Sequence, residues 1–183
     1  MAETIKKKIS QTNLQAWLLS LGYENTKTID ELGQKIGLDF TDFLRTEQPY
    51  MTTAQIQVAK QSGMHIGAHS FDHALMQDKQ QRDKMQAEIA KSIADIKNRF
   101  DTSVRSFAFP FTDAGVRADE IDKMRTSCDI SFGTAGLKQD SAVQHYQRLP
   151  MEIGAYSAEQ ILKNAYFYYW MLRPIGKHKM QRT

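Results

Sequence analysis

The sequence predicts an α/β fold in which short parallel strands alternate with helices from about residue 50 onward. An apolar stripe predicts a long helix at 85–100, and short apolar segments at 65–68, 104–109 and 130–132 lie between helical stretches. This alternation is typical of parallel strands joined by right-handed crossovers. Functional residues in such folds gather after the carboxyl ends of strands, so candidate site residues are expected there.

The composition is that of a folded globular protein. The chain has 183 residues, of which 41% are hydrophobic and 25% charged, and these proportions exclude a disordered or collagen-like chain. Four basic residues and no acidic residue lie in the last eleven positions. The sequence pI of 8.9 owes much to this tail, so it gives no reason to expect a nucleic-acid partner.

The sequence carries no pattern for a disulfide, a bilayer span or a signal peptide. Cys128 is the single cysteine, and we interpret it as a small buried side chain. The longest apolar run, 165–172, is less than half of a membrane span. Polar residues at 10–13 stand where a signal peptide has its apolar core, so we expect a cytoplasmic protein.

Residues 1–49 are predicted to form a helical segment, and residues 50–183 a separate α/β domain. Apolar residues between Ile5 and Leu21 recur at roughly helical spacing, and a second helix is expected from Thr28 to Gly37. The segment contains no histidine or cysteine, so it offers no soft metal ligand. Candidate catalytic and metal-binding residues are therefore expected after residue 50.

The elements of the α/β domain follow from local patterns. A short helix ends near Gly63, and a strand is expected at 65–68. The long helix has apolar residues spaced by 4, 4, 3 and 4, namely Met85, Ile89, Ile93, Ile96 and Phe100. A strand at 104–109 is apolar on both faces, as in a covered sheet, and ends at Pro110.

Two further elements complete the domain. A helix around 121–124 leads to a strand at 130–132, and the Gly-rich stretch 133–136 is interpreted as a turn because it lacks the Lys of a phosphate loop. Ser157 and Gln160 form a capping box for a last helix at 158–172. Its many aromatic residues are expected to pack one face on the sheet, the alternative being a surface for sugars or a partner.

His69 and His73 are the strongest candidates for chemistry. They follow a predicted strand and lie four residues apart, a spacing at which two imidazoles can bind one metal ion. His65 and His69 show the same spacing, so spacing alone leaves structural histidines as an open alternative.

The motifs at 66–73 (IGAHSFDH) and 107–111 (FAFPF) together resemble the polysaccharide deacetylase family, the NodB-homology domain. The resemblance extends over about residues 50–151. It implies a partial or distorted (β/α) barrel of the polysaccharide deacetylase type, here with an N-terminal helical segment.

The resemblance also implies an activity, metal-dependent hydrolysis of acetyl groups from an amino-sugar polysaccharide or glycan. Such an enzyme is a hydrolase of non-peptide carbon–nitrogen bonds, and its partner is an acetylated carbohydrate. His69 and His73 would bind a divalent metal, with zinc as the first expectation, and the backbone N–H of Phe111 would stabilise the oxyanion. Substrate contacts are expected from four residues: Phe109, Pro110, Asp113 and Arg148.

The sequence also departs from the family pattern. The Asp-Asp pair that supplies a metal ligand and the general base precedes the histidine motif in the family, yet the acids here, Asp30, Asp39 and Asp42, stand in helical contexts. Ala108 and Thr112 replace an arginine and a glycine, and the sequence 148–150 stands near the place of a Leu-x-His motif. The general base therefore stays unassigned.

These departures leave three hypotheses. The first is the later part of a longer deacetylase, and the second is a catalytically inactive carbohydrate-binding remnant of the same fold. The third, ranked last, is an interaction protein that binds nucleic acid or anionic lipid through its basic tail and aromatic helix. A strand at 65–68 without its neighbour would expose an edge, so we also expect self-association of the isolated chain.

Overall fold

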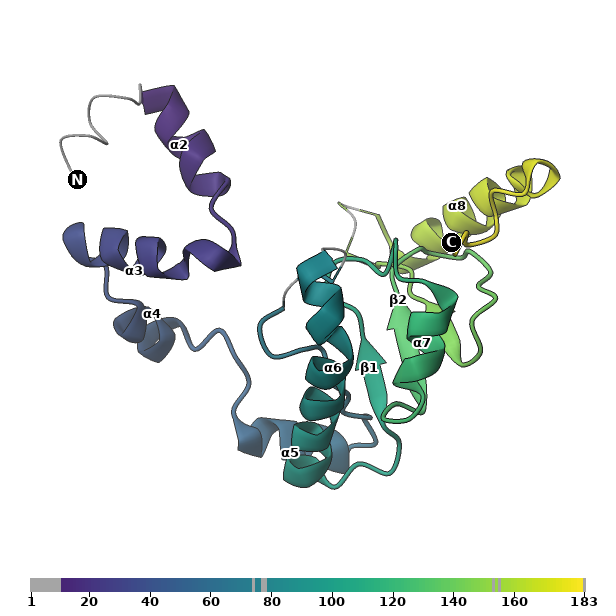
Figure 1. Cartoon of the computed structure of the whole chain (residues 1–183), viewed down its shortest axis with the longest axis horizontal. Helices are drawn as coiled ribbons and strands as arrows, with labels where there is room; N and C mark the ends of the chain where they lie inside the picture. Colours follow the sequence, from purple (N-terminus) through teal and green to yellow (C-terminus); the bar gives the residue numbers. More distant parts are fainter. Residues whose placement is uncertain (1–10, 74, 77–78, 153, 155, 183) are drawn as a thin grey trace. The chain divides into compact units, whose positions relative to one another are not determined.

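The computed structural model describes residues 11–73, 75–76, 79–152, 154 and 156–182 (Figure 1). The chain divides into two units, Met1–Thr52 and Thr53–Thr183. The positions Ile5 and Ile9 of the predicted first helix lie outside the described residues.

The first unit is helical, as its sequence predicts. It contains α2 (Gln11–Leu19), η1 (Tyr23–Asn25), α3 (Thr26–Lys35) and α4 (Phe40–Glu47). Asp39 caps α4, because its Oδ1 accepts the N–H of Thr41 at 2.8 Å. Asp30 and Asp42 lie within helices, so among the described residues none of the three aspartates follows a strand.

The second unit is built on a small parallel sheet. Its elements are α5 (Thr53–Gln61), α6 (Lys79–Phe100), β1 (Ser106–Ala108), α7 (Ala118–Met124), β2 (Ile130–Gly133), β3 (His145–Gln147), α8 (Ala158–Met171) and η2 (Arg173–Ile175). The strand order is β1-β2-β3, and both pairs are parallel. The α/β prediction is confirmed, and the described strands form an open sheet, which is part of a barrel at most.

The core lies where α6 and α7 pack on the sheet, beside β1 and β2 in Figure 1. Ile89 of α6 and Phe107 of β1 are completely buried. The predicted stripe of α6 is confirmed, because it supplies Met85, Ile89 and Ile93 to this core, with Ile96 packed against it. Cys128 is buried at the edge of the core, where its Sγ lies 3.0 Å from the carbonyl oxygen of Ile130.

The strand expected at 65–68 is wrong in extent, since only Ala68 pairs, through a parallel bridge to Phe107. Ala68 donates to the carbonyl of Ser106 and accepts from the N–H of Ala108, both at 2.9 Å. Among the described strands, only β1 pairs with this segment, and none pairs with it on its other side. The strand expected at 104–109 is also shorter, and β3 was not expected.

Helix α8 does not pack as its aromatic residues suggested. The capping box of Ser157 and Gln160 is confirmed. The helix is attached through the buried Ile161 and through the hydroxyl of Tyr169, which donates to the carbonyl of Ala135 at 2.9 Å. The remaining aromatic side chains are each more than half exposed: Tyr166, Phe167, Tyr168 and Trp170.

Among the residues that the structure describes, no helix has the length and apolarity that a bilayer span requires.

Ile89→Ala tests the packing of α6 on the sheet. The substitution leaves a cavity at a side chain that is 0% exposed, so the free energy of unfolding should fall by about 2–5 kcal/mol. Lys97→Ala, at an exposed position of the same helix, is the control and should stay within about 0.5 kcal/mol. Urea unfolding measures both. Equal values for the two variants would contradict this assignment of the core.

Candidate functional site

A cleft of about 630 Å³ opens at the carboxyl ends of the strands. His69 follows the bridge at Ala68, Phe109 follows β1, Thr134 follows β2 and Arg148 follows β3. This is the edge at which parallel α/β folds place their sites. The cleft is lined by His69, His73, Phe109, Phe111, Thr134, Arg148, Leu149, Pro150, Met151 and Glu152.

The loop 69–73 brings the two histidine side chains together. The hydroxyl of Ser70 accepts the N–H of His73 at 2.9 Å, which folds the loop back on itself. Ser70 and His73 both have positive φ, at 64° and 53°, a conformation that costs a non-glycine residue free energy and is often found at functional sites. As a result, the Nε2 atoms of His69 and His73 lie 3.0 Å apart.

The hydrogen bonding of His69 fixes the tautomer and the orientation of its ring. Its Nδ1–H donates to the carbonyl of Ala108 at 2.7 Å, which leaves Nε2 with a lone pair directed at His73. Burial lowers the pKa of His69, and the nearby His73 and Arg148 lower it further, against the hydrogen bond to Ala108. A neutral imidazole oriented by a backbone carbonyl is the usual form of a metal ligand, so the pair fits a divalent ion.

The turn after β1 holds Phe111 against the histidine pair. Its ring packs edge-on against His73, with 4.6 Å between the ring centroids. Phe111 has a φ of 52°, and no described residue accepts a hydrogen bond from its backbone N–H. Pro110 is buried and does not line the cleft. The turn therefore leaves the N–H of Phe111 without an acceptor among the described residues, while its ring lies against His73.

Arg148 connects two strand ends at the floor of the cleft. It donates from Nη2 to the carbonyl of Phe109 at 2.7 Å and from Nε to the carbonyl of Gly133 at 3.0 Å. Burial lowers its pKa. No carboxylate of the described residues lies within ion-pair distance of it, so its charge is not neutralised by a salt bridge. A half-buried guanidinium of this kind attracts carbonyl or anionic oxygens.

Glu152 is a cleft residue that sequence reasoning missed. It is the one carboxylate among the described lining residues and comes four positions after Arg148. The available signal was its position just beyond a strand end, but β3 itself was not recognised, so Glu152 had no strand to follow.

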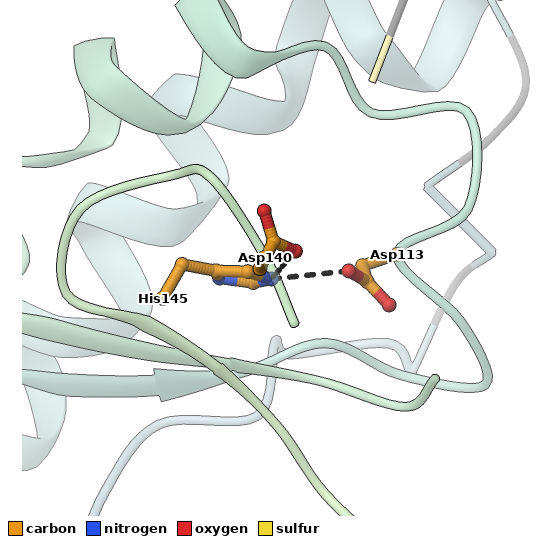
Figure 2. A group of neighbouring side chains, drawn as sticks. All are labelled: Asp113, Asp140 and His145. Atoms are coloured by element: carbon orange, nitrogen blue, oxygen red, sulfur yellow. Dashed lines mark hydrogen bonds and ion pairs between the residues drawn. The ribbon is translucent and has the colours of Figure 1, made fainter. Parts of the chain in front are cut away.

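Asp113 lies outside the cleft lining, in a second cluster. Asp113, Asp140 and His145 each offer a ligand atom, and these atoms lie within 4.8 Å of one another, which is the composition of a metal site. Figure 2 shows the imidazole of His145 directed toward both carboxylates. Its Nε2 donates to Oδ2 of Asp113 at 3.0 Å, and its Nδ1 lies 2.7 Å from the hydroxyl of Ser131.

Arg182 already supplies positive charge to this cluster. Its Nη2 lies 2.6 Å from Oδ2 of Asp113 and 2.6 Å from Oδ2 of Asp140, and its side chain is 1% exposed. Its Nη1 donates to the carbonyl of Val116 at 2.7 Å. An imported cation would have to displace this guanidinium, so we interpret the cluster as a buried ion network. The tail is therefore not freely solvated, because Arg182 lies in the interior.

Hydrogen bonds keep both acids of the network ionised. Burial raises the pKa of Asp113, but bonds from His145, Gln147, the N–H of Thr134 and Arg182 outweigh burial and bring the pKa well below its ordinary value. The pKa of Asp140 is also lowered, chiefly by Arg182 against the effect of burial. A Cβ at Gly133 would lie 2.3 Å from Oδ2 of Asp113, so this position excludes a side chain.

Asp140→Asn tests the ion network through its pH dependence. The variant should lose about 1.5–3 kcal/mol of unfolding free energy at pH 7, the range for hydrogen bonds to charged groups. Because the folded pKa of Asp140 is lowered, its contribution is present above the unfolded pKa of about 3.9 and is lost as the pH falls toward the folded value. The difference from the parent should therefore shrink below about pH 4.

Urea unfolding at pH 7 and pH 3 checks this prediction. Asp122→Asn, an exposed carboxylate on α7, is the matched control and should change stability by less than about 0.5 kcal/mol at both values. A loss for Asp140→Asn that is the same at pH 7 and pH 3 would contradict the network.

Comparison with known families identifies the chain. A family model described as polysaccharide deacetylase matches residues 5–126, more than half of the sequence. The match begins in the helical first unit, whereas the motif resemblance begins at about residue 50; both include the two histidines and the turn at Phe111. Searches of curated proteins and of solved structures found no match. The chain belongs to the polysaccharide deacetylase family.

Proposed function

We propose that this chain forms the metal-binding half of a carbohydrate deacetylase site that hydrolyses the acetamide of an amino sugar. The observation that carries the proposal is the pair of Nε2 atoms 3.0 Å apart, in a cleft that also holds a free backbone N–H at Phe111. Family membership supports a hydrolase acting on carbon–nitrogen bonds, and this family is typically metal-dependent.

His69 and His73 would hold a divalent ion through Nε2, with zinc as the first expectation for an imidazole pair. When bound, such an ion polarises the acetyl carbonyl and lowers the pKa of a water molecule. The N–H of Phe111 would donate to the carbonyl oxygen as it becomes negative, and Arg148 would add positive charge at the cleft floor. Phe111, whose side chain is exposed, provides apolar surface for the sugar ring, whereas Phe109 is completely buried in the core and offers none.

A deacetylase also needs a group that takes a proton from water. Within the described lining of the cleft, Glu152 is the carboxylate available for this role. We assign Glu152 as the residual base of this chain and expect acetate release to be slow, because loss of an optimal general base costs about 10²–10⁴-fold.

His69→Ala and His73→Ala test the metal site. Each variant should weaken Zn²⁺ binding by more than about 100-fold, since even changes to groups that orient metal ligands cost 10–100-fold. His65→Ala is the matched control. It has the same spacing to His69, but its Nε2 lies 3.0 Å from the hydroxyl of Ser106, so Zn²⁺ binding should persist. Calorimetric titration measures all three, and unchanged binding in both site variants would refute the assignment.

Glu152→Gln tests the residual base. The purified chain loaded with Zn²⁺ is incubated with a chitin oligosaccharide, and acetate release is followed over time. The variant should lose most of the remaining rate, at least about 10²-fold, with Zn²⁺ affinity unchanged. Glu159→Gln, on the exposed surface of α8, is the control.

Three outcomes of the acetate assay separate the hypotheses. Equal rates for the two glutamate variants would exclude Glu152. Zn²⁺ and oligosaccharide binding without any acetate release would identify an inactive carbohydrate-binding domain instead. Rapid release by the parent chain would show that its own acids already form a complete site.

A further inference from the structure

The C-terminal segment is anchored to the sheet unit by backbone pairing. After η2, Gly176 adopts a φ of 71° and reverses the chain. Gln139 then donates to the carbonyl of His178 at 2.9 Å and accepts the N–H of Met180 at 2.7 Å. This short parallel pairing carries Arg182 into the buried cluster.

Arg182 forms hydrogen bonds with the downstream end of the turn that carries Phe111. Its guanidinium bonds the carboxylate of Asp113 and lies 3.5 Å from the carbonyl oxygen of the same residue. It also bonds the carbonyl of Val116, three residues further along. Asp113 is two positions after Phe111, so these hydrogen bonds from Arg182 restrain the downstream side of the turn directly.

The upstream end of the same turn is held by a different arginine. Arg148 bonds the carbonyl of Phe109, two positions before Phe111. The turn between the residues held by Arg148 and Arg182 is tight, because the backbone N of Thr112 lies 2.5 Å from the carbonyl oxygen of Pro110. Phe111 at its centre has a positive φ, a conformation that surrounding structure must maintain.

We propose that Arg182 is a positioning residue for the cleft, which holds the turn so that Phe111 keeps its N–H free and its ring against His73. This inference rests on the proposed function for its catalytic meaning, but its structural content concerns only Arg182, the turn and His73. Without the hydrogen bonds from Arg182 to Asp113, Phe111 would relax toward negative φ, which changes the direction of its N–H and moves its ring away from His73.

Arg182→Lys is the principal variant. Lysine keeps the charge but has a single ammonium, which cannot reproduce a fork that reaches two carboxylates and backbone carbonyls together. Arg125→Lys, at an exposed arginine after α7, is the matched control. Asp140→Asn is the second variant, because it weakens the hydrogen bonds that orient the guanidinium of Arg182 while Arg182 and Asp113 themselves are unchanged.

The main readout is the NMR spectrum of the metal-free chain, with the amide of Phe111 and the imidazole of His73 as reporters. Both resonances should shift in Arg182→Lys and, in the same direction, in Asp140→Asn, and should keep their positions in Arg125→Lys. Shifts confined to residues that touch Arg182, with Phe111 and His73 unchanged in a folded variant, would overturn the proposal. If Arg182→Lys does not fold, the same criteria apply to Asp140→Asn.

A second readout connects the positioning to chemistry. Zn²⁺ affinity should be unchanged in Arg182→Lys, and kcat for acetate release should fall by about 10–100-fold with KM nearly constant, as for a small misplacement of a catalytic group. The NMR result does not depend on metal or substrate. Failure of the proposed activity would therefore leave the NMR result intact, whereas failure of the positioning would leave the resonances unmoved.

Discussion

The buried carboxylate of Asp113 is the group on which the second half of the molecule depends. It accepts hydrogen bonds from the N–H of Thr134 after β2, from His145 and Gln147 of β3, and from Arg182. Burial of an ionised carboxylate costs several kcal/mol of hydration free energy, so the buried charge is stable only when all of these donors are in place. Because groups after β2 and on β3 meet on one residue, the network also favours a single register between these strands.

The features that depend on neighbouring residues could be predicted from the sequence. The stripe of α6 is a local periodicity, and burial of Ile89 and Met85 follows from it. His69 and His73 could be singled out because they lie four positions apart and follow a predicted strand end. Their positions as ligands stay a prediction, but the meeting of their rings follows from the short loop and its bond to Ser70.

The features that depend on distant residues could not be predicted in this way. Asp113 and Arg182 are 69 positions apart, and a lone arginine in a basic tail has the pattern of a solvated residue. Strand β3 has only three residues and carries His145 inward as a polar group, so it lacks the apolar alternation that marks a strand. Without β3, neither Glu152 nor the role of Arg148 as a link between strand ends had a structural context.

The single cysteine is a natural probe for local unfolding of the layer between α7 and the sheet. Cys128 is 3% exposed between α7 and β2, and burial raises the pKa of its thiol. A thiol that is both hidden and protonated reacts slowly with alkylating reagents while the core is closed. Its labelling rate therefore follows the population in which α7 has separated from the sheet, so local breathing of this layer is measurable without introducing any probe.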